Sequence, residues 1–410
     1  MGRTIGSSEQ TGGREKGREP PRGSAPLWLL ALITLSGTFA MHAFVPALPI
    51  AAREFGAGIG EAQLTLSAYI IGLSVGQLTY GPVADRYGRR PVLFIGMAVY
   101  CLASLAAMAA PTIHVLVAIR FLQALGGCTG LVLGRAIVRD LSTGSDTARR
   151  LSLMNLMVMA GPGLSPLLGS LLTDLTGWRS IFAALSLLGL GNFVLIWRLL
   201  PETGGTGSHD FRSILRSYGH LVRSRQFLGY AIGGSCATTS VYAFVSAAPF
   251  IFVEQLHRPH QEVGVYLMVN IVGAWLGSLV ANRLIGRFPA ERLMTAGNLL
   301  SCFCALVLLG FVASGSFGVA AIVVPMLFLT LGAGLTSPMA MSAALGVNPA
   351  VAASASGLYG ALQMAVGAAC ATLSGIGGNP AVAVGVVLLS AGVLAQAAFA
   401  SVRMRKAPDG

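Results

Sequence analysis

Charged side chains are the scarcest feature of this sequence. Asp, Glu, Lys and Arg make up 10% of its 410 residues, whereas hydrophobic residues make up 54%. A soluble domain carries about 25% charged residues. A chain with so little polar surface cannot cover its apolar residues in water. The composition therefore excludes a soluble enzyme or a disordered protein, and it indicates a protein whose main solvent is lipid.

Motifs that bind nucleotides or metals, or that carry hydrolytic chemistry, are missing as well. The chain has no phosphate-binding loop, no HExxH and no GxSxG. Its six cysteines all lie in apolar runs, and none forms a CxxC pair: Cys101, Cys128, Cys236, Cys302, Cys304 and Cys370. We therefore expect no metal site, no ATP-driven pump and no enzyme.

What is present is a succession of long uncharged runs. The longest, from Leu293 to Val402, holds no Asp, Glu, Lys or Arg. A spanning segment needs roughly 20 apolar residues, and backbone groups in lipid must pair within the segment, so each span is expected to be a helix. Turn signals divide the runs into twelve spans. We predict an all-α membrane protein with a disordered tail (residues 1–26), a six-helix bundle (27–200), a linker (201–225), a second six-helix bundle (226–402) and a short tail (403–410).

The basic residues alternate between the predicted loops. The two tails, the linker and the other even-numbered loops carry 23 Lys and Arg, whereas the odd-numbered loops carry only Arg53, Arg179 and Arg258. Cytoplasmic loops carry the excess of Lys and Arg, so both termini and the linker are predicted to be cytoplasmic. Nucleic-acid binding, the rival explanation of the net charge of +12, is disfavoured because the charge lies on alternate short loops.

The two halves of the chain resemble each other. Gly76 and Asp85 have the same spacing as Gly273 and Asn282, about half a chain later. Glycines four residues apart, as in Gly72 with Gly76, permit close helix packing. Two six-helix halves joined by a polar linker predict a transporter whose halves rock around a central site.

Residues 76–90 carry the most specific pattern, with glycines at a helix end and a tight turn, and an acid and three arginines at the membrane surface. The pattern resembles the signature loop of the major facilitator superfamily, which in that family braces the cytoplasmic gate. The alternative is a basic loop that only sets topology. The matching positions are Gly76, Gly81, Asp85, Arg86, Gly88, Arg89 and Arg90.

Two further segments narrow the resemblance. Residues 120–127 and 134–140 are similar to the fourth helix of the bicyclomycin and chloramphenicol resistance (Bcr/CflA-type) transporters. This resemblance covers roughly residues 28–402, and it implies twelve helices in two bundles and proton-driven export of small drug-like molecules. The fifth span also resembles the signature of drug/proton antiporters, or else it is an ordinary proline-kinked packing helix. Its matching residues are Gly161, Ser165, Pro166 and Gly169.

Arg120 is the only fully charged residue deep in a span. Placing it there costs about 2.5–3.5 kcal/mol, so it should face the bundle interior. The family resemblance implies a role in proton coupling, and the alternative is an arginine that binds carbonyls and locks two helices.

Where relatives often have an acid in the first helix, this chain has His42, a side chain whose ordinary pKa of about 6.5 lies within the physiological pH range. His42 is thus the leading candidate for the proton carrier, against the alternative of a neutral histidine bonded to a carbonyl.

Contacts with the transported molecule are expected from polar and aromatic residues inside the spans, which could line a mostly apolar cavity. Each of them could instead be an interhelical hydrogen-bond partner. The lack of deep acids favours neutral, zwitterionic or weakly acidic molecules over strongly cationic ones. The candidates are Tyr69, Gln123, Asn155, Tyr242, Asn270, Tyr359 and Gln363.

Three functions are compatible with these observations. The leading one is a proton-coupled exporter of drugs or metabolites in the bacterial inner membrane, driven by the proton gradient without a cofactor and sufficient as a monomer. The second is an importer or facilitator of a sugar, nucleoside or osmolyte on the same fold. The third, from another class, is a membrane sensor or scaffold that transports nothing.

The orientation can be tested directly. Because basic residues crowd the tails and even-numbered loops, reporter fusions placed after Pro201 and after Lys406 are both expected to report a cytoplasmic location. A periplasmic signal from either fusion would overturn the helix count or the orientation.

Overall fold

The computed structural model describes residues 25–142, 144–203, 211–348 and 351–406. The predicted tails therefore lie largely outside the described residues. The N-terminal half begins with α1 (Leu27–Ala43), which continues through a 3₁₀ turn (Val45–Ala47) into α2 (Leu48–Phe55). It goes on with α3 (Ile59–Tyr87), α4 (Arg89–Met108), α5 (Ile113–Asp140), α6 (Gly144–Thr176) and α7 (Arg179–Leu199).

A short amphipathic helix, α8 (Phe211–Arg223), occupies the linker. The C-terminal half begins with α9 (Arg225–Thr239), which leads into α10 (Val241–Phe250) and a π-helical turn (Ile251–Gln255). It continues with α11 (His260–Leu284), α12 (Ala290–Ala313), α13 (Val319–Gly346), α14 (Ala352–Leu373) and α15 (Pro380–Lys406).

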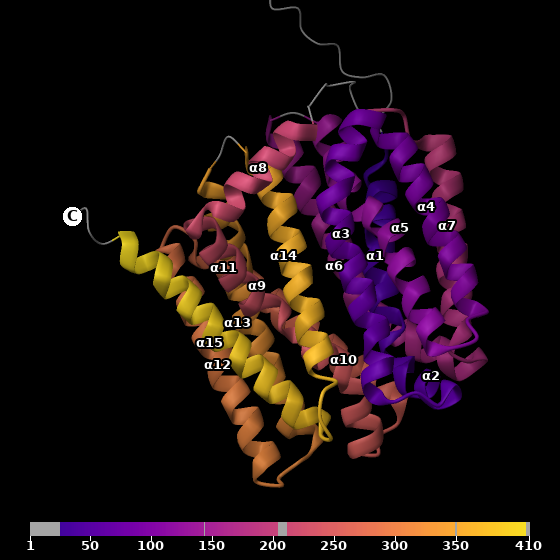
Figure 1. Ribbon diagram of the computed structural model, residues 1–410, viewed down its shortest axis with the longest axis vertical. Helices are drawn as coiled ribbons and strands as arrows, with labels where there is room; N and C mark the ends of the chain where they lie inside the picture. The colour runs from indigo at the N-terminus through magenta and orange to yellow at the C-terminus, as the bar shows by residue number, and fades with distance from the viewer. Residues whose placement is uncertain (1–24, 143, 204–210, 349–350, 407–410) are drawn as a thin grey trace, which may run out of the picture.

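The described helices form two bundles that stand side by side (Figure 1). Ten segments are long and apolar enough to cross a bilayer, counting Leu27–Phe55 and Arg225–Gln255 as one each. The other two long helices, α3 and α14, pack against each other between the halves, where the Ser74 hydroxyl donates to the Ala361 carbonyl. The predicted all-α membrane fold is confirmed for the described part of the chain. The cytoplasmic placement of the termini stays a prediction.

Small residues let the helices approach closely, as the Gly-x-x-x-Gly spacings predict. A Cβ added at Gly76 would lie 2.6 Å from the Cβ of Cys128 on α5, and one added at Gly277 would overlap the backbone of α13. Lipid tails supply no hydrophobic force between helices, so such close backbone packing is a main source of their association.

The halves are joined more firmly at one end than at the other. At the end away from α8, which we call the far end, Arg53 pairs with Glu254 at 3.6 Å and His260 contacts Asp174. At the opposite end, the linker end, a cavity separates the halves. In the orientation that the loop charges predict, this cavity opens to the cytoplasm. The described arrangement is therefore open at the linker end and closed at the far end.

The fifth span, α6, packs between the two halves through its signature residues. A Cβ at Gly161 would collide with Leu35, and one at Gly169 would overlap the Ala43 carbonyl oxygen, both on α1. A Cβ at Gly264 on α11 would lie 3.0 Å from the Pro166 carbonyl oxygen. The Ser165 hydroxyl is buried and has no hydrogen-bond partner among the described residues. The signature helix thus contacts α1 of its own half and α11 of the other.

Gly169 is therefore predicted to be essential to packing, whereas Gly163 on the same helix is not. Gly169→Ala should destabilise the protein by roughly 1–3 kcal/mol, because the methyl group has no room. Gly163→Ala should be neutral or stabilising by up to about 1 kcal/mol, since nothing lies within 4 Å of its Cβ position and Ala favours a helix.

The measurement is thermal unfolding in detergent, followed with a thiol-reactive dye. All six cysteines are free, and Cys128, Cys236, Cys304 and Cys370 are buried until the bundle opens. Equal melting temperatures for the two variants would contradict the packing assigned to Gly169.

Candidate functional site

Arg120 lies in the centre of the N-terminal bundle and is completely buried. Its Nη1 donates to the Ala40 carbonyl at 3.1 Å and to Gln123 Oε1 at 2.6 Å. The Gln123 amide in turn donates to the Ser104 hydroxyl at 2.8 Å. The Nε and Nη2 atoms of Arg120 have no hydrogen-bond partner among the described residues, and no carboxylate there pairs with it. The guanidinium is thus a buried charge held by neutral acceptors.

Aromatic rings enclose the rest of this guanidinium. Its central carbon lies 4.1 Å from the centre of the Tyr69 ring, 5.6 Å from that of Phe44 and 5.8 Å from that of Phe182. Such cation–π contacts are worth about 2 kcal/mol or more when they are desolvated. The Tyr69 hydroxyl donates to the Gly37 carbonyl at 2.7 Å, so this ring is fixed against α1. Three predicted site residues, Tyr69, Arg120 and Gln123, are therefore brought together.

His42 lies at the boundary between the halves, 8% exposed. Its Nδ1 lies 2.9 Å from the Thr38 carbonyl oxygen. A carbonyl only accepts hydrogen bonds, so Nδ1 carries the hydrogen and Nε2 is left as the atom that can gain a proton. The ring centre lies 6.3 Å from that of Tyr242 in the other half, and Arg120 is close enough to act on His42 electrostatically. His42 thus touches both halves.

The remaining predicted cavity residues do not join this group. Gln363 donates to the Thr238 hydroxyl at 3.0 Å, as an interhelical partner would. Asn270 is buried with its Oδ1 unpartnered in the described structure, and so is the Tyr359 hydroxyl. Asn155 is exposed on α6. These residues are spread over the C-terminal half and α6, and none of the four hydrogen-bonds to Arg120 or His42 in the described structure.

The signature loop forms a charge network at the linker end. Arg89 pairs with Asp85 at 2.7 Å and with Asp140 on α5 at 3.2 Å. Its backbone N–H donates to Glu202, just after α7, at 2.8 Å. Gly88 has a φ of 95°, and a Cβ there would lie 2.8 Å from a Glu202 oxygen, so only glycine fits this turn.

The other members of the loop have separate partners. Arg90 donates to the Trp197 carbonyl at 2.7 Å, and Arg86 lies over the Tyr87 ring at 5.3 Å. Gly81 has open space around its Cβ position. The loop therefore ties α3, α4, α5 and α7 together at the linker end.

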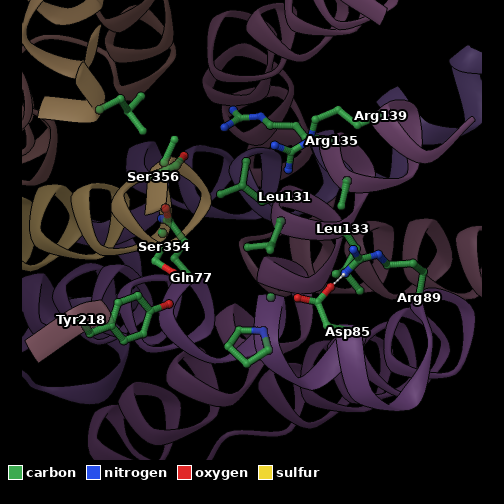
Figure 2. A pocket seen from close by; sticks show the side chains of 17 residues that line it. Gln77, Asp85, Arg89, Leu131, Leu133, Arg135, Arg139, Tyr218, Ser354 and Ser356 are labelled. Carbon is green, nitrogen blue, oxygen red and sulfur yellow. Dashed lines mark ion pairs between the residues drawn. The ribbon is translucent and has the colours of Figure 1, made fainter. Parts of the chain in front are cut away.

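The cavity at the linker end has a volume of about 410 Å³ and lies between the halves. Figure 2 shows Arg135 and Arg139 on one side of it, Ser354 and Ser356 across from them, and the Asp85–Arg89 pair on a further side. Arg135 and Arg139 belong to the fourth-helix segment and to the basic loop that predicts topology, but neither they nor these serines were among the predicted site residues. The available signal was the spacing of four residues between the arginines, which places both on one face of a helix.

Comparison with known proteins agrees with this architecture. The chain matches the Major Facilitator Superfamily over residues 30–372. It is similar to multidrug resistance protein D of Escherichia coli, with 30% identity over 85% of this chain and 88% of the relative. It is also similar to a bicyclomycin resistance protein homolog of Haemophilus influenzae, with 28% identity over 84% of this chain and 87% of the relative.

Solved structures confirm the fold. A D-xylose–proton symporter superposes with a TM-score of 0.71 at 15% identity, covering 90% of this chain and 96% of the symporter. A bacterial homolog of the human lysosomal transporter Spinster, inward-facing and occupied, also reaches 0.71 at 15% identity, covering 93% and 96%. At that identity the likeness concerns the fold alone. The family match and the named relatives, together with the two helical bundles of the described chain, show that this chain belongs to the major facilitator superfamily and is a multi-pass membrane transporter.

Proposed function

We propose that the chain exports small drug-like molecules across the bacterial inner membrane in exchange for protons, by alternating access and as a monomer. The observation that carries the proposal is His42, a titratable side chain at the boundary between the halves and near the buried Arg120. The similarity to proteins named for multidrug and bicyclomycin resistance supports the direction and the cargo. The proton gradient supplies the energy, and no cofactor is needed.

The chemistry follows from the protonation of one nitrogen. A proton taken up at His42 Nε2 places a second positive charge near Arg120, and like charges repel strongly where water is excluded. The repulsion favours a rearrangement of the halves that brings water to His42. A cargo molecule that binds better to the arrangement in which His42 is neutral then competes with the proton. By linkage, cargo binding lowers the proton affinity of His42, and protonation lowers the affinity for cargo by the same factor.

The energy is sufficient. A membrane potential of about 100 mV supplies roughly 2.3 kcal/mol for each charge moved. At about 1.4 kcal/mol for each tenfold gradient, this supports a gradient of roughly 50-fold. One titrating histidine can therefore drive useful export.

The proposal is tested in bacterial cells that lack their own exporters. Cells that express the chain are expected to tolerate more bicyclomycin or chloramphenicol and to accumulate less of it, and an uncoupler should abolish both effects. Greater accumulation on expression would instead indicate an importer or facilitator. No change in flux for any compound tested would indicate a sensor or scaffold.

His42 is predicted to carry the proton. His42→Ala should abolish gradient-driven export while leaving cargo binding, because it removes the buried ring nitrogen that is proposed to bind the proton near Arg120. His42→Asp should retain export, since a carboxylate also binds and releases a proton. His114→Ala is the matched control, because His114 is exposed and, among the described residues, pairs with Glu61 at 3.7 Å, away from His42.

The measurement is proton release from purified protein on addition of chloramphenicol, followed with a pH dye in weak buffer. Proton release by His42→Ala equal to that of the parent would rule out His42 as the carrier.

Two substitutions of Gln123 distinguish the contribution of Arg120 to folding from the contribution of its positive charge to proton coupling. Gln123→Leu removes an acceptor from a buried charge and should destabilise the protein by about 1–3 kcal/mol. Gln123→Glu keeps an acceptor and should fold normally, but it neutralises Arg120 and should weaken proton-driven export severalfold. Thermal unfolding and drug accumulation measure the two effects. Normal export by well-folded Gln123→Glu would mean that the charge of Arg120 takes no part in coupling.

A further inference from the structure

We propose that the linker-end cavity captures cargo through an anionic group, a carboxylate, phosphate or sulfonate, which binds to Arg135 and Arg139. The inference rests on the proposed function in one respect, that the ligand of this cavity is the transported molecule. It adds a chemical class of cargo and a site outside the group around Arg120.

The two arginines lie one helical turn apart on α5 and both line the cavity (Figure 2). Both are exposed. Asp85, which lines the same cavity, and Asp140, which follows Arg139 in the chain, both pair with Arg89, at 2.7 Å and 3.2 Å. No ion pair or hydrogen bond of the Arg135 or Arg139 side chain is found within the described structure. The cavity therefore presents two guanidinium groups that form no ion pair within the described structure.

These two positive charges also destabilise each other. Like charges four residues apart on a helix are unfavourable, and Arg139 acts on Arg135 electrostatically. Walls of low dielectric strengthen the repulsion and concentrate the positive potential inside the cleft. An anion that binds between the two groups removes the repulsion and gains charge-assisted hydrogen bonds from both.

The opposite wall of the cavity carries hydroxyl groups and no carboxylate, so it does not repel an anion. That wall comes from α13 and α14, which lie within the run from Leu293 to Val402 that has no charged residue. It presents the hydroxyl groups of Ser354 and Ser356 to the cavity (Figure 2). Hydroxyls can donate hydrogen bonds to an anionic oxygen, and no carboxylate on this wall repels it. The cavity is thus asymmetric, cationic on one side and neutral but polar on the other.

A lipid headgroup carries the same chemistry, but the position of the cavity favours a free small molecule. The lining comes from both halves and from Tyr218 of α8, so the cavity lies between the bundles. The Tyr218 hydroxyl donates to the Leu78 carbonyl at 3.3 Å, which holds α8 beside the cavity. Its volume of about 410 Å³ fits a small molecule better than a phospholipid with its two chains.

The test compares two xanthene dyes of opposite charge, carboxyfluorescein and rhodamine 6G, binding to the full chain in neutral detergent. Fluorescence anisotropy is expected to show tighter binding of carboxyfluorescein, weakening as salt is added. Replacing both arginines (Arg135→Gln with Arg139→Gln) should lower carboxyfluorescein affinity by about tenfold or more, because two charge-assisted bonds are lost. Binding of rhodamine 6G should not weaken.

Matched variants separate charge from folding. Arg149→Gln removes an exposed arginine outside the cavity lining and should leave carboxyfluorescein binding unchanged. Replacing both cavity arginines with lysine keeps the charge and should preserve most of the affinity. Thiol-dye melting checks that each variant is folded. Equal carboxyfluorescein affinity of the parent and the folded double Gln variant would overturn the inference.

A second arm distinguishes a lipid headgroup. The protein is placed in phosphatidylcholine vesicles with and without phosphatidylglycerol. If the two arginines govern phosphatidylglycerol binding and not carboxyfluorescein binding, the cavity is a headgroup site and the inference is wrong. Loss of dye binding in the double Gln variant, in a protein that shows no proton-driven export, would support the anion site and overturn the proposed function. Intact proton-driven export by a protein that binds both dyes equally would support the proposed function and overturn the anion site.

Discussion

The N-terminal half is organised around the burial of one guanidinium group. A buried charge must find acceptors or polarisable partners, and Arg120 takes them from four helices: the Ala40 carbonyl on α1, the Tyr69 ring on α3, Gln123 on its own helix and the Phe182 ring on α7. These partners fix the helices relative to one another. Because none of them is a carboxylate, the positive charge persists, and it can act on whatever charge comes near.

The fold was largely readable from the distribution of charge. Uncharged runs and glycine or proline turns marked the helices, because only a helix satisfies its own backbone in lipid. The depth of Arg120 and the position of His42 were readable for the same reason, since a polar group inside a span is costly and therefore conspicuous. Contacts between distant helices were not readable. That Tyr69 caps Arg120 whereas Asn155 is exposed depends on helix rotation, which an almost uniformly apolar helix does not reveal.

In the charge network at the linker end, contacts between residues far apart in the sequence determine which arginines are paired with acids. Asp85 and Asp140 are far apart in the sequence, and each has an arginine close by in the chain. In the structure both acids pair with the Arg89 guanidinium, and the Arg89 backbone N–H donates to the Glu202 carboxylate. This choice of partner leaves Arg135 and Arg139 facing the cavity. Basic residues whose positions predict the orientation of the chain therefore also set the electrostatic character of the opening between the halves.

The absence of charge from Leu293 to Val402 has a consequence for how the membrane voltage acts on this protein. An electric field exerts force only on charges and dipoles that move through it, and the described parts of α13, α14 and most of α12 and α15 carry no side-chain charge within the bilayer. Their displacement during rocking involves almost no gating charge. Of the charged side chains in the described spans, Arg120 is buried in the N-terminal half. The proposed proton on His42 would add a second charge there and make this half the voltage-sensitive one.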